Sequence, residues 1–192
     1  IVSDRHSTLE RLKKEYRHLV HIPEHPHVVR VLDADVIPGC DIPFLVFEYV
    51  EGADVGDMIH DRLLSPEDAL ELGKQVIEGL VHLHAQGFHH CDIKPRNLLW
   101  TQKGAKIIDF NVSVRADDRE SRGGGSRRYL PPDFDPEVIP HNSERADRDL
   151  YALGLTLYEA LTARYPWDTM APPINKPAPD PRELSGFADL AP

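Results

Sequence analysis

The stretch FHHCDIKPRNLLW, residues 88–100, constrains the fold more than any other part of the sequence. It places two histidines, a cysteine, two cations, an aspartate and an asparagine between apolar ends. The run Leu98-Leu99-Trp100 favours burial, so it would hold these polar groups close to the core, unlike a solvated turn. We therefore interpret residues 90–97, the polar loop, as a functional site.

The composition indicates one globular domain. The chain has 192 residues, of which 41% are hydrophobic, and 32 acidic against 22 basic residues give a net charge of −10. This acidic balance argues against nucleic acid as a partner. Cys40 and Cys91 lack the spacing of a disulfide framework or of a Cys/His zinc site. We also find no signal peptide and no apolar run near the roughly 18 residues of a membrane span, so we expect a cytoplasmic location and no membrane contact in this segment.

Apolar periodicity predicts the order of helices and strands. A three-to-four spacing predicts a helix from about Ser7 to Leu19, and the β-branched runs 25–36 and 42–50, separated by Pro38-Gly39, predict a hairpin. Ser65 and Pro66 mark the start of a long buried helix that stops at Gly87.

A second hairpin and a second long helix follow the polar loop. The runs 97–100 and 105–110 predict a hairpin whose second strand ends at Asp109, and residues 147–167 predict an apolar helix with Asp149 near its start. From residue 171 onward, proline-rich sequence predicts an extended or poorly ordered tail. This order of elements indicates an α+β fold.

The polar residues then match a known pattern. The motif His90-x-Asp92-x-Lys94-x-x-Asn97 is followed, after the predicted hairpin, by Asp109-Phe110-Asn111. Together they resemble the catalytic loop H-R-D-x-K-P-x-N and the metal-binding D-F-G of the protein kinase superfamily. The resemblance implies a kinase-like two-lobed fold, here with a truncated N-lobe and a mostly helical C-lobe.

The resemblance assigns roles that suit phosphoryl transfer. This reaction needs a carboxylate that orients the acceptor hydroxyl, a cation that offsets the charge of the moving group, and oxygen ligands for Mg²⁺. By resemblance, Asp92 is the catalytic base and Lys94 contacts the γ-phosphate. Asn97 and Asp109 would bind the Mg²⁺ that accompanies ATP.

The segment FLVFEYVEG resembles the kinase hinge, although taken alone it would favour a core strand and a turn. By resemblance, Phe47 is the gatekeeper, and the backbone of Glu48 and of Val50 holds adenine. Asp54 would contact the ribose, and Leu99 would form the apolar floor under adenine.

Other segments extend the resemblance over about residues 7–168. GSRRYLPPD is similar to the end of a kinase activation loop, with Ser126 at the threonine position, and Asp149 matches an aspartate that caps the catalytic-loop backbone. Glu15 occupies the place of the helix glutamate that pairs with a lysine beside the nucleotide. The apolar side chains of a regulatory spine would be Leu19, Val31, His90 and Phe110.

The sequence departs from the family at several positions. No glycine-rich loop and no suitable lysine precede Glu15, and nothing after Trp167 resembles the later C-lobe helices. We therefore expect a fragment made of a partial N-lobe (1–50), a C-lobe core (51–170) and a proline-rich tail (171–192). Cys91 stands where the family has an arginine that pairs with a phosphate group on the activation loop. A neutral cysteine cannot form this pair, so control by phosphorylation of the loop is not implied. Asn111 replaces the glycine of D-F-G, a conservative change because asparagine tolerates left-handed backbone.

The resemblance predicts a serine/threonine protein kinase domain that uses ATP and Mg²⁺ to phosphorylate protein substrates, with no oligomeric state indicated. Lys94 within DIKPRN is typical of serine/threonine kinases, and the Pro-Pro-Asp segment separates the chain from small-molecule kinases. We expect the fragment alone to be inactive. The alternative is a pseudokinase that binds nucleotide or acts as a scaffold without turnover. The chain also resembles, more weakly, kinase domains of large bacterial proteins.

Overall fold

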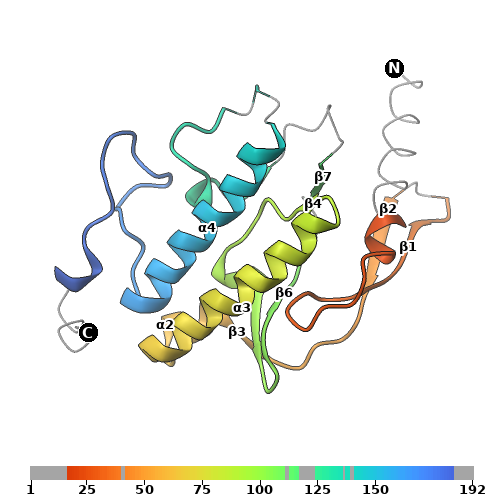
Figure 1. Ribbon diagram of the computed structural model, residues 1–192, viewed down its shortest axis with the longest axis horizontal. Helices are drawn as coiled ribbons and strands as arrows, with labels where there is room; N and C mark the ends of the chain where they lie inside the picture. The colour runs from red at the N-terminus through yellow and green to blue at the C-terminus, as the bar shows by residue number, and fades with distance from the viewer. Residues whose placement is uncertain are drawn as a thin grey trace.

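The computed structural model describes residues 17–39, 42–110, 113–116, 124–135, 137–138 and 141–183. Two long helices, α3 (Pro66–Ala85) and α4 (Asn142–Thr162), pack side by side and form the larger half of the molecule (Figure 1). Three small antiparallel sheets accompany them. The mixture of helices and small antiparallel sheets confirms the α+β prediction.

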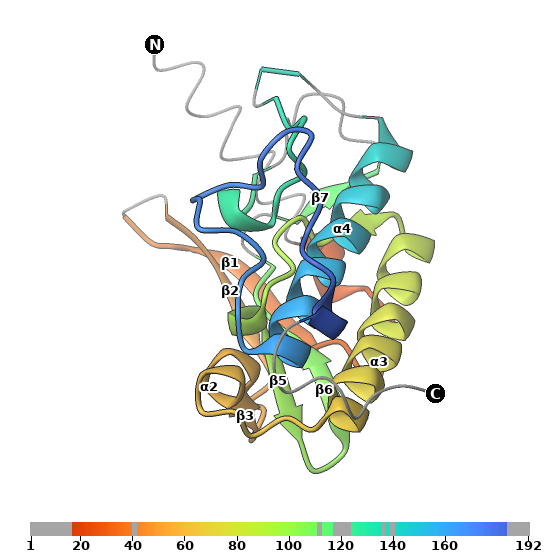
Figure 2. The ribbon, with the colours of Figure 1, turned by 90° about the vertical axis from the view of Figure 1, so that its left-hand side faces the viewer.

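A three-stranded sheet supports α3. It has the order β3 (Ala53–Asp54), β5 (Leu98–Thr101), β6 (Gly104–Ile107), and β5 and β6 form a tight hairpin in which Leu98 pairs with Ile107 and Thr101 pairs with Gly104. Figure 2 shows this sheet beneath α3. The second strand of the predicted hairpin thus ends at Ile107, because Asp109 adopts a left-handed backbone (φ 67°) that cannot continue a strand.

The core lies between these layers. Its buried side chains are apolar residues of α3, α4 and the sheet: Leu72, Val76, Leu80, Leu83, Leu98, Ile107, Ala152 and Leu153. Because each fully buried aliphatic side chain contributes about 1.5–3 kcal/mol relative to an exposed one, this cluster stabilises the chain more than any surface contact.

The helix α3 follows its sequence signals closely. Ser65 Oγ accepts a hydrogen bond from Asp68 N at 3.0 Å, and Asp68 Oδ2 accepts one from Ser65 N at 3.2 Å, which completes a capping box. Gly87 has a φ of 77° beyond the last turn, a conformation that glycine adopts without steric penalty. The predicted start and stop are confirmed.

The helix α4 starts earlier than predicted. It begins at Asn142, with His141 as N-cap, and Glu144 Oε2 accepts a hydrogen bond from His141 N at 2.9 Å. This cap lies before the apolar repeat from which the start was predicted. Asp149 is therefore two turns inside the helix, where its side chain faces the polar loop instead of solvent.

The N-terminal part of the chain joins the sheet through its backbone. Residues 17–20 are helical, and residues 7–16 of the predicted first helix lie outside the described residues. After this turn, Val29 N donates to Ile107 O at 2.8 Å, and Ile107 N donates to His27 O at 2.9 Å. This ladder connects the first segment of the chain to β6.

A separate antiparallel pair, β1 (Val31–Ile37) and β2 (Ile42–Phe47), confirms the predicted first hairpin. Its register pairs Ile37 with Ile42 and Val31 with Phe47. Residues 40 and 41 of its turn lie outside the described residues. The hairpin extends beside the helical turn at residues 17–20 (Figure 1).

Short elements complete the described chain. They are α2 (Val55–His60), β4 (Phe88–His89), which pairs with β7 (Val114–Arg115), and the 3-10 helices η1 (Pro95–Asn97), η2 (Arg127–Tyr129) and η3 (Pro181–Glu183). Residues 171–180 contain neither helix nor strand, and residues 184–192 of the predicted tail lie outside the described part. Among the described residues, no helix is both long enough and apolar enough to cross a membrane.

Candidate functional site

The polar loop follows β4 and includes η1, and a side chain of α4 fixes its backbone. The buried Asp149 accepts hydrogen bonds from His90 N at 3.0 Å (Oδ2) and from Cys91 N at 2.7 Å (Oδ1). Cys91 has a φ of 65°, a conformation that non-glycine residues rarely adopt. The carboxylate thus holds in place a backbone turn that would otherwise be unfavourable. This is the capping contact that the resemblance predicted for Asp149.

His90 connects the polar loop to the segment after β6. Its Nε2 donates to Ile108 O at 3.0 Å, and its Nδ1 accepts from Asp92 N at 3.3 Å, so the ring is the neutral tautomer with the proton on Nε2. The His90 ring is fully buried, and its centroid lies 5.5 Å from that of Phe110. The predicted packing of His90 on Phe110 is present.

The Asp92 carboxylate is the centre of a hydrogen-bond network. Its Oδ2 lies 2.6 Å from Lys94 Nζ and 3.1 Å from Asn97 Nδ2, and its Oδ1 accepts from Ser126 N at 2.6 Å. Burial alone would raise the pKa of Asp92, but the hydrogen bonds from Lys94 and Ser126 outweigh it and leave the pKa below its ordinary value. Asp92 is therefore an ionised, positionally fixed carboxylate at neutral pH.

Lys94 and Asn97 are oriented by the same network. Lys94 Nζ also donates to Ser126 Oγ at 2.8 Å, and its side chain is 23% exposed, so the ammonium group reaches the protein surface. The buried Asn97 donates through Nδ2 to the Asp92 backbone oxygen at 2.8 Å. Because the amide nitrogen faces Asp92, the amide oxygen is the atom that can serve as a metal ligand.

The segment that carries Asp109 is bonded to the backbone of Asn97. Ile108 N donates to Asn97 O at 3.0 Å, and Asp109 follows directly with its left-handed backbone. This bond keeps the segments that carry the two predicted metal ligands, an amide oxygen and a carboxylate, next to each other. This donor set suits Mg²⁺, which prefers oxygen ligands.

Phe110 lies between the polar loop and the β1–β2 hairpin. It is 1% exposed, and its ring centroid lies 6.3 Å from that of Phe47, the predicted gatekeeper. Leu19 and Val31 are also buried and border the same small cavity as Phe110. The four side chains of the predicted spine thus share one apolar region.

The glycine-rich segment closes over the polar loop, a contact that the sequence did not indicate. Gly125 has a φ of 132°, and a Cβ at this position would lie 2.4 Å from Cys91 O. Only glycine allows this approach, and it places Ser126 N on Asp92. The sequence signal was the GGGS run, which composition alone could only mark as a flexible loop.

The residues that follow Ser126 dock on α4 and on the segment after it. Tyr129 Oη donates to Glu159 Oε1 at 2.8 Å, and Tyr165 Oη donates to Arg128 O at 2.6 Å. The Arg128 guanidinium lies 4.0 Å from the centroid of the Tyr165 ring, within the range of a cation–π contact. These contacts hold residues 128–129 against α4 and the residues that follow it.

The predicted hinge has partly different contacts from those expected. Glu48 N already donates to Arg30 O at 3.0 Å, so only its carbonyl oxygen remains for a ligand. Its side chain forms an ion pair with Lys106 at 2.5 Å. Burial tends to raise the pKa of Glu48, but the hydrogen bond from Lys106 outweighs it and lowers the pKa. Val50 follows β2 and is half-buried.

Asp54, predicted to contact the ribose, is the N-cap of α2. Its Oδ1 accepts from Asp57 N at 3.1 Å and lies 3.3 Å from Arg96 Nη1. The sequence did not predict α2, because six residues are too few to show a helical period. Leu99 pairs with Asp54 across β5 and β3 and is half-buried.

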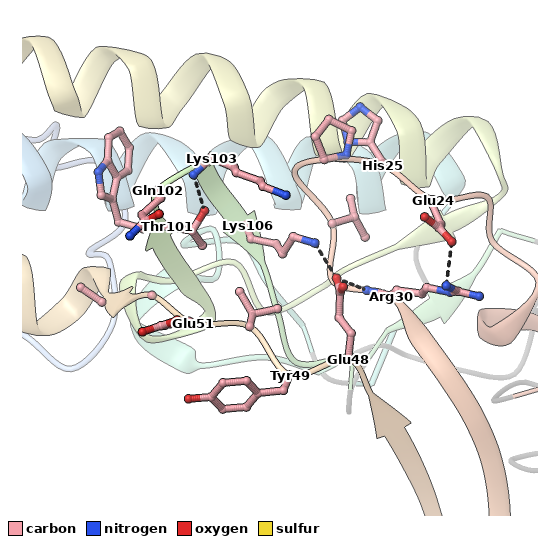
Figure 3. Close-up of a pocket in the computed structure, with 16 residues that line it drawn as sticks. Glu24, His25, Arg30, Glu48, Tyr49, Glu51, Thr101, Gln102, Lys103 and Lys106 are labelled. Carbon is pink, nitrogen blue, oxygen red and sulfur yellow. Dashed lines mark hydrogen bonds and ion pairs between the residues drawn. The ribbon is translucent and has the colours of Figure 1, made fainter.

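A cavity lies away from the polar loop. It has a volume of about 900 Å³ and contains the Glu48–Lys106 ion pair, with Arg30, Glu24 and His25 on its wall (Figure 3). None of Asp92, Asn97 or Asp109 borders it. We assign the functional site to the polar loop, because the chemically suitable groups converge there.

Several predicted residues cannot be placed. Glu15 and Asn111 lie outside the described residues. The same holds for Cys40.

Comparison with known proteins identifies the family. The model of the protein kinase domain matches residues 2–176, so the chain belongs to the protein kinase family. A probable serine/threonine-protein kinase of Streptomyces coelicolor, SCO3848, is 35% identical over 153 residues, or 74% of this chain. Serine/threonine-protein kinase PrkC of Bacillus subtilis is 32% identical over 151 residues, or 76% of this chain.

The match covers only a part of these relatives. The probable serine/threonine-protein kinase pknA2 of Bifidobacterium longum is 32% identical over 170 residues, which is 88% of this chain. The chain spans 22% of the length of each of these three relatives. The likeness thus concerns one kinase domain within much longer proteins.

Proposed function

We propose that the chain contributes the catalytic loop of a serine/threonine protein kinase, which transfers the γ-phosphate of ATP to protein hydroxyls. The observation that carries this proposal is the Asp92 carboxylate, which is ionised and held by Lys94, Asn97 and Ser126. Support also comes from the family and from relatives named as serine/threonine kinases.

The Oδ1 oxygen of Asp92 can accept one more hydrogen bond. Its Oδ2 already accepts from Lys94 and Asn97, whereas Oδ1 accepts from Ser126 N. Since each carboxylate oxygen offers about two lone-pair positions, Oδ1 can accept a substrate hydroxyl as well. Its low pKa makes Asp92 a weak base, so its main contribution is to orient the hydroxyl and accept the proton late in the transfer.

Lys94 supplies a positive charge next to the Asp92 carboxylate, at Oδ2. Its ammonium group is fixed by two hydrogen bonds and is partly exposed on the same side as Asp92. A fixed cation at this distance stabilises negative charge that develops between the acceptor and the transferred group. Lys94 would therefore contact the γ-phosphate.

Asn97 and Asp109 would hold the metal. Bound Mg²⁺ and ATP supply the phosphoryl group and neutralise part of its charge. The chain's own part is to present the Asn97 amide oxygen and the Asp109 carboxylate next to each other. The bond between Ile108 N and Asn97 O supports this assignment, because it keeps the segments that carry the two residues next to each other.

The predicted hinge segment would bind one edge of the adenine ring. The Glu48 carbonyl oxygen and the Val50 backbone are the groups proposed to face the base, and Leu99 would lie under it. Asp54 Oδ1 is engaged by Asp57 and Arg96, so the ribose would contact Oδ2. Glu15 is proposed to pair with a lysine that positions the phosphates.

The test compares nucleotide binding and phosphate transfer in the full-length gene product. Asp109→Ala should abolish the Mg²⁺ dependence of ATP binding while leaving the thermal unfolding midpoint unchanged, and Asp35→Ala, an exposed acid on β1, serves as the matched control. Wild type should label serine or threonine in a generic protein substrate with γ-phosphate. Mg²⁺-dependent binding that survives in Asp109→Ala would contradict the metal assignment. Binding without any transfer by wild type would favour the pseudokinase alternative.

A further inference from the structure

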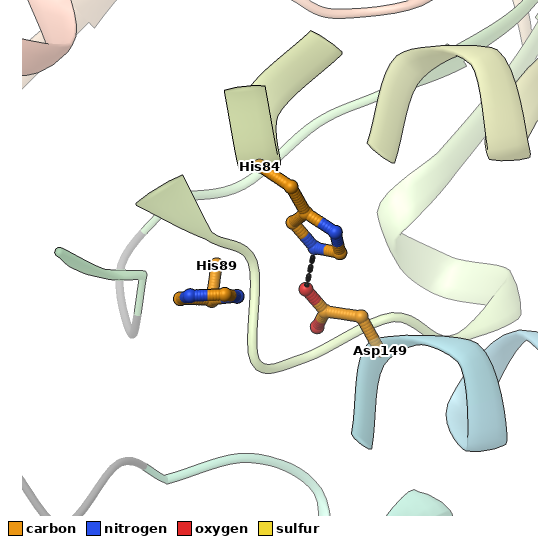
Figure 4. Close-up of side chains that lie close together, drawn as sticks. All are labelled: His84, His89 and Asp149. Atoms are coloured by element: carbon orange, nitrogen blue, oxygen red, sulfur yellow. Dashed lines mark hydrogen bonds and ion pairs between the residues drawn. The ribbon is translucent and has the colours of Figure 1, made fainter. Parts of the chain in front are cut away.

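Three potential metal ligands meet behind the polar loop, away from the proposed Mg²⁺ ligands. They are His84 in the last turn of α3, His89 in β4 and Asp149 in α4 (Figure 4). One ligand atom from each lies within 4.8 Å of the others. His84 Nε2 is 2.8 Å from Asp149 Oδ2, and the His84 and His89 ring centroids are 4.9 Å apart.

His89 has no structural explanation as a core residue. It is 4% exposed, and its Nδ1 is buried without a hydrogen-bond partner among the described residues. Such an unpaired buried group costs about 1–3 kcal/mol, and an apolar side chain would avoid this cost. The kinase reaction proposed above does not use His89. A ligand that satisfies the ring would account for its presence.

The protonation state of His89 suits metal binding. Burial, followed by the neighbouring His84, lowers the pKa of His89 to about 4, so the ring is neutral at pH 7. A neutral imidazole is the form that binds metals. Figure 4 shows a ring nitrogen of His89 facing the His84–Asp149 pair.

We propose that His84, His89 and Asp149 form a binding site for Zn²⁺ or a similar divalent transition metal. Two imidazole nitrogens and one carboxylate oxygen are a common zinc donor set, with a water molecule as the fourth ligand. Bond lengths of about 2.0–2.1 Å place tetrahedral ligands roughly 3.3 Å apart. The pair His84 Nε2 and Asp149 Oδ2 therefore separates by only a few tenths of an ångström, while His89 moves inward.

Binding also changes hydrogen bonds within the site. His84 donates its Nε2 proton to Asp149 in the metal-free protein, so in the metal-bound form the ring proton is on Nδ1. The buried Arg145, whose charge contributes to the low pKa of His89, repels a cation. We therefore expect an affinity in the micromolar range, well below that of closed structural zinc sites.

The site would connect three elements at the base of the polar loop. Asp149 accepts from the His90 and Cys91 amides as well as from His84. A metal at this point would cross-link α3, β4 and α4 around the same carboxylate. The sequence gave no indication of such a site, because its third ligand, Asp149, lies 60 residues beyond His89 in the chain.

The test measures metal binding and thermal unfolding of the full-length gene product after treatment with EDTA. We expect one Zn²⁺ per chain with a micromolar Kd by calorimetry, and a rise in Tm of about 5–10 °C at a hundredfold excess over Kd. His89→Val should weaken binding at least tenfold and remove the rise in Tm. His60→Val, at an exposed position in α2, should behave as wild type.

Two further comparisons separate this site from others. Millimolar Mg²⁺ should not compete with Zn²⁺, because Mg²⁺ prefers all-oxygen ligands. His89→Val should be at least as stable as wild type in EDTA, since it removes the unpaired nitrogen. The proposal is wrong if His89→Val binds Zn²⁺ as tightly as wild type, or if wild type binds no Zn²⁺. Loss of binding in Cys91→Ser but not in His89→Val would likewise overturn it.

Discussion

The polar loop and the β1–β2 hairpin both contact Phe110, through His90 and Phe47, and they differ in how many of their side chains find a partner within the chain. In the loop, Asp92 accepts three hydrogen bonds. Asp149 of α4 accepts hydrogen bonds from the loop amides of His90 and Cys91. In the hairpin, one face carries exposed apolar residues: Ile37, Ile42, Phe44 and Val46 are each 37–54% exposed. The loop is a preorganised site, whereas the hairpin presents an uncovered surface.

This difference shows which part of the domain the chain specifies by itself. Electrostatic preorganisation needs every polar partner in place, and the described residues supply those partners for Asp92. A two-stranded hairpin is only marginally stable alone and needs a covering surface on its apolar face. The described residues therefore supply the hydrogen-bond partners of Asp92, but they do not cover the apolar face of the hairpin.

The largest predicted effect is the loss of the bond between α4 and the loop. Asp149→Asn should lower the free energy of unfolding by roughly 3 kcal/mol and the transfer rate at least about a hundredfold, because the buried amides of His90 and Cys91 lose a charged acceptor. Denaturant unfolding and a steady-state rate would measure both. Asp168→Asn, at an exposed site, is the control. An unchanged rate would mean that the loop keeps its geometry without this carboxylate.

A pair of leucine substitutions compares the two regions directly. Leu83→Ala in α3, where the side chain is fully buried, should destabilise the chain by about 2–5 kcal/mol. Leu32→Ala in β1, where the side chain is 45% exposed, should change stability by no more than about 0.5 kcal/mol. Urea unfolding of both variants measures the difference. Equal losses would show that the hairpin is as tightly packed as the helical core.

A smaller effect concerns pH in metal-free protein. His89 has a pKa near 4 in the folded state, below the ordinary value of 6.5, so the unfolded chain binds a proton more readily between these values. Its contribution makes the folded state less stable as pH falls from 6.5 towards 4, by roughly 1 kcal/mol per pH unit. His89→Val should show a shallower decline between pH 6.5 and 5 in urea unfolding with EDTA. Parallel curves for both proteins would contradict the buried neutral state.

Several elements followed from local sequence signals. Ser65, Pro66 and Gly87 set both ends of α3. The start of α4 was predicted too late, since its cap at His141 precedes the apolar repeat. Short elements such as α2 give no period, so the capping role of Asp54 could not be predicted.

Only part of the candidate site could be predicted from the sequence. The residues Asp92, Lys94, Asn97 and Asp109 were found through motif resemblance, and the structure joins the first three in one hydrogen-bond network. The bond from Ser126 N to Asp92 joins residues 34 positions apart through a glycine-rich segment whose composition indicates a flexible loop and does not indicate this contact. The His84, His89 and Asp149 cluster likewise depends on how α3 and α4 pack. Long-range packing, not local propensity, creates both features.

The central claim, that the polar loop catalyses phosphoryl transfer through Asp92, is tested most directly by the transfer rate of Asp92→Asn in the full-length gene product. Asparagine keeps the size of the side chain but removes the negative charge that orients the hydroxyl and accepts its proton. We predict a rate at least about a thousandfold below wild type, with Mg²⁺-dependent ATP binding retained. A transfer rate equal to that of wild type would contradict the claim.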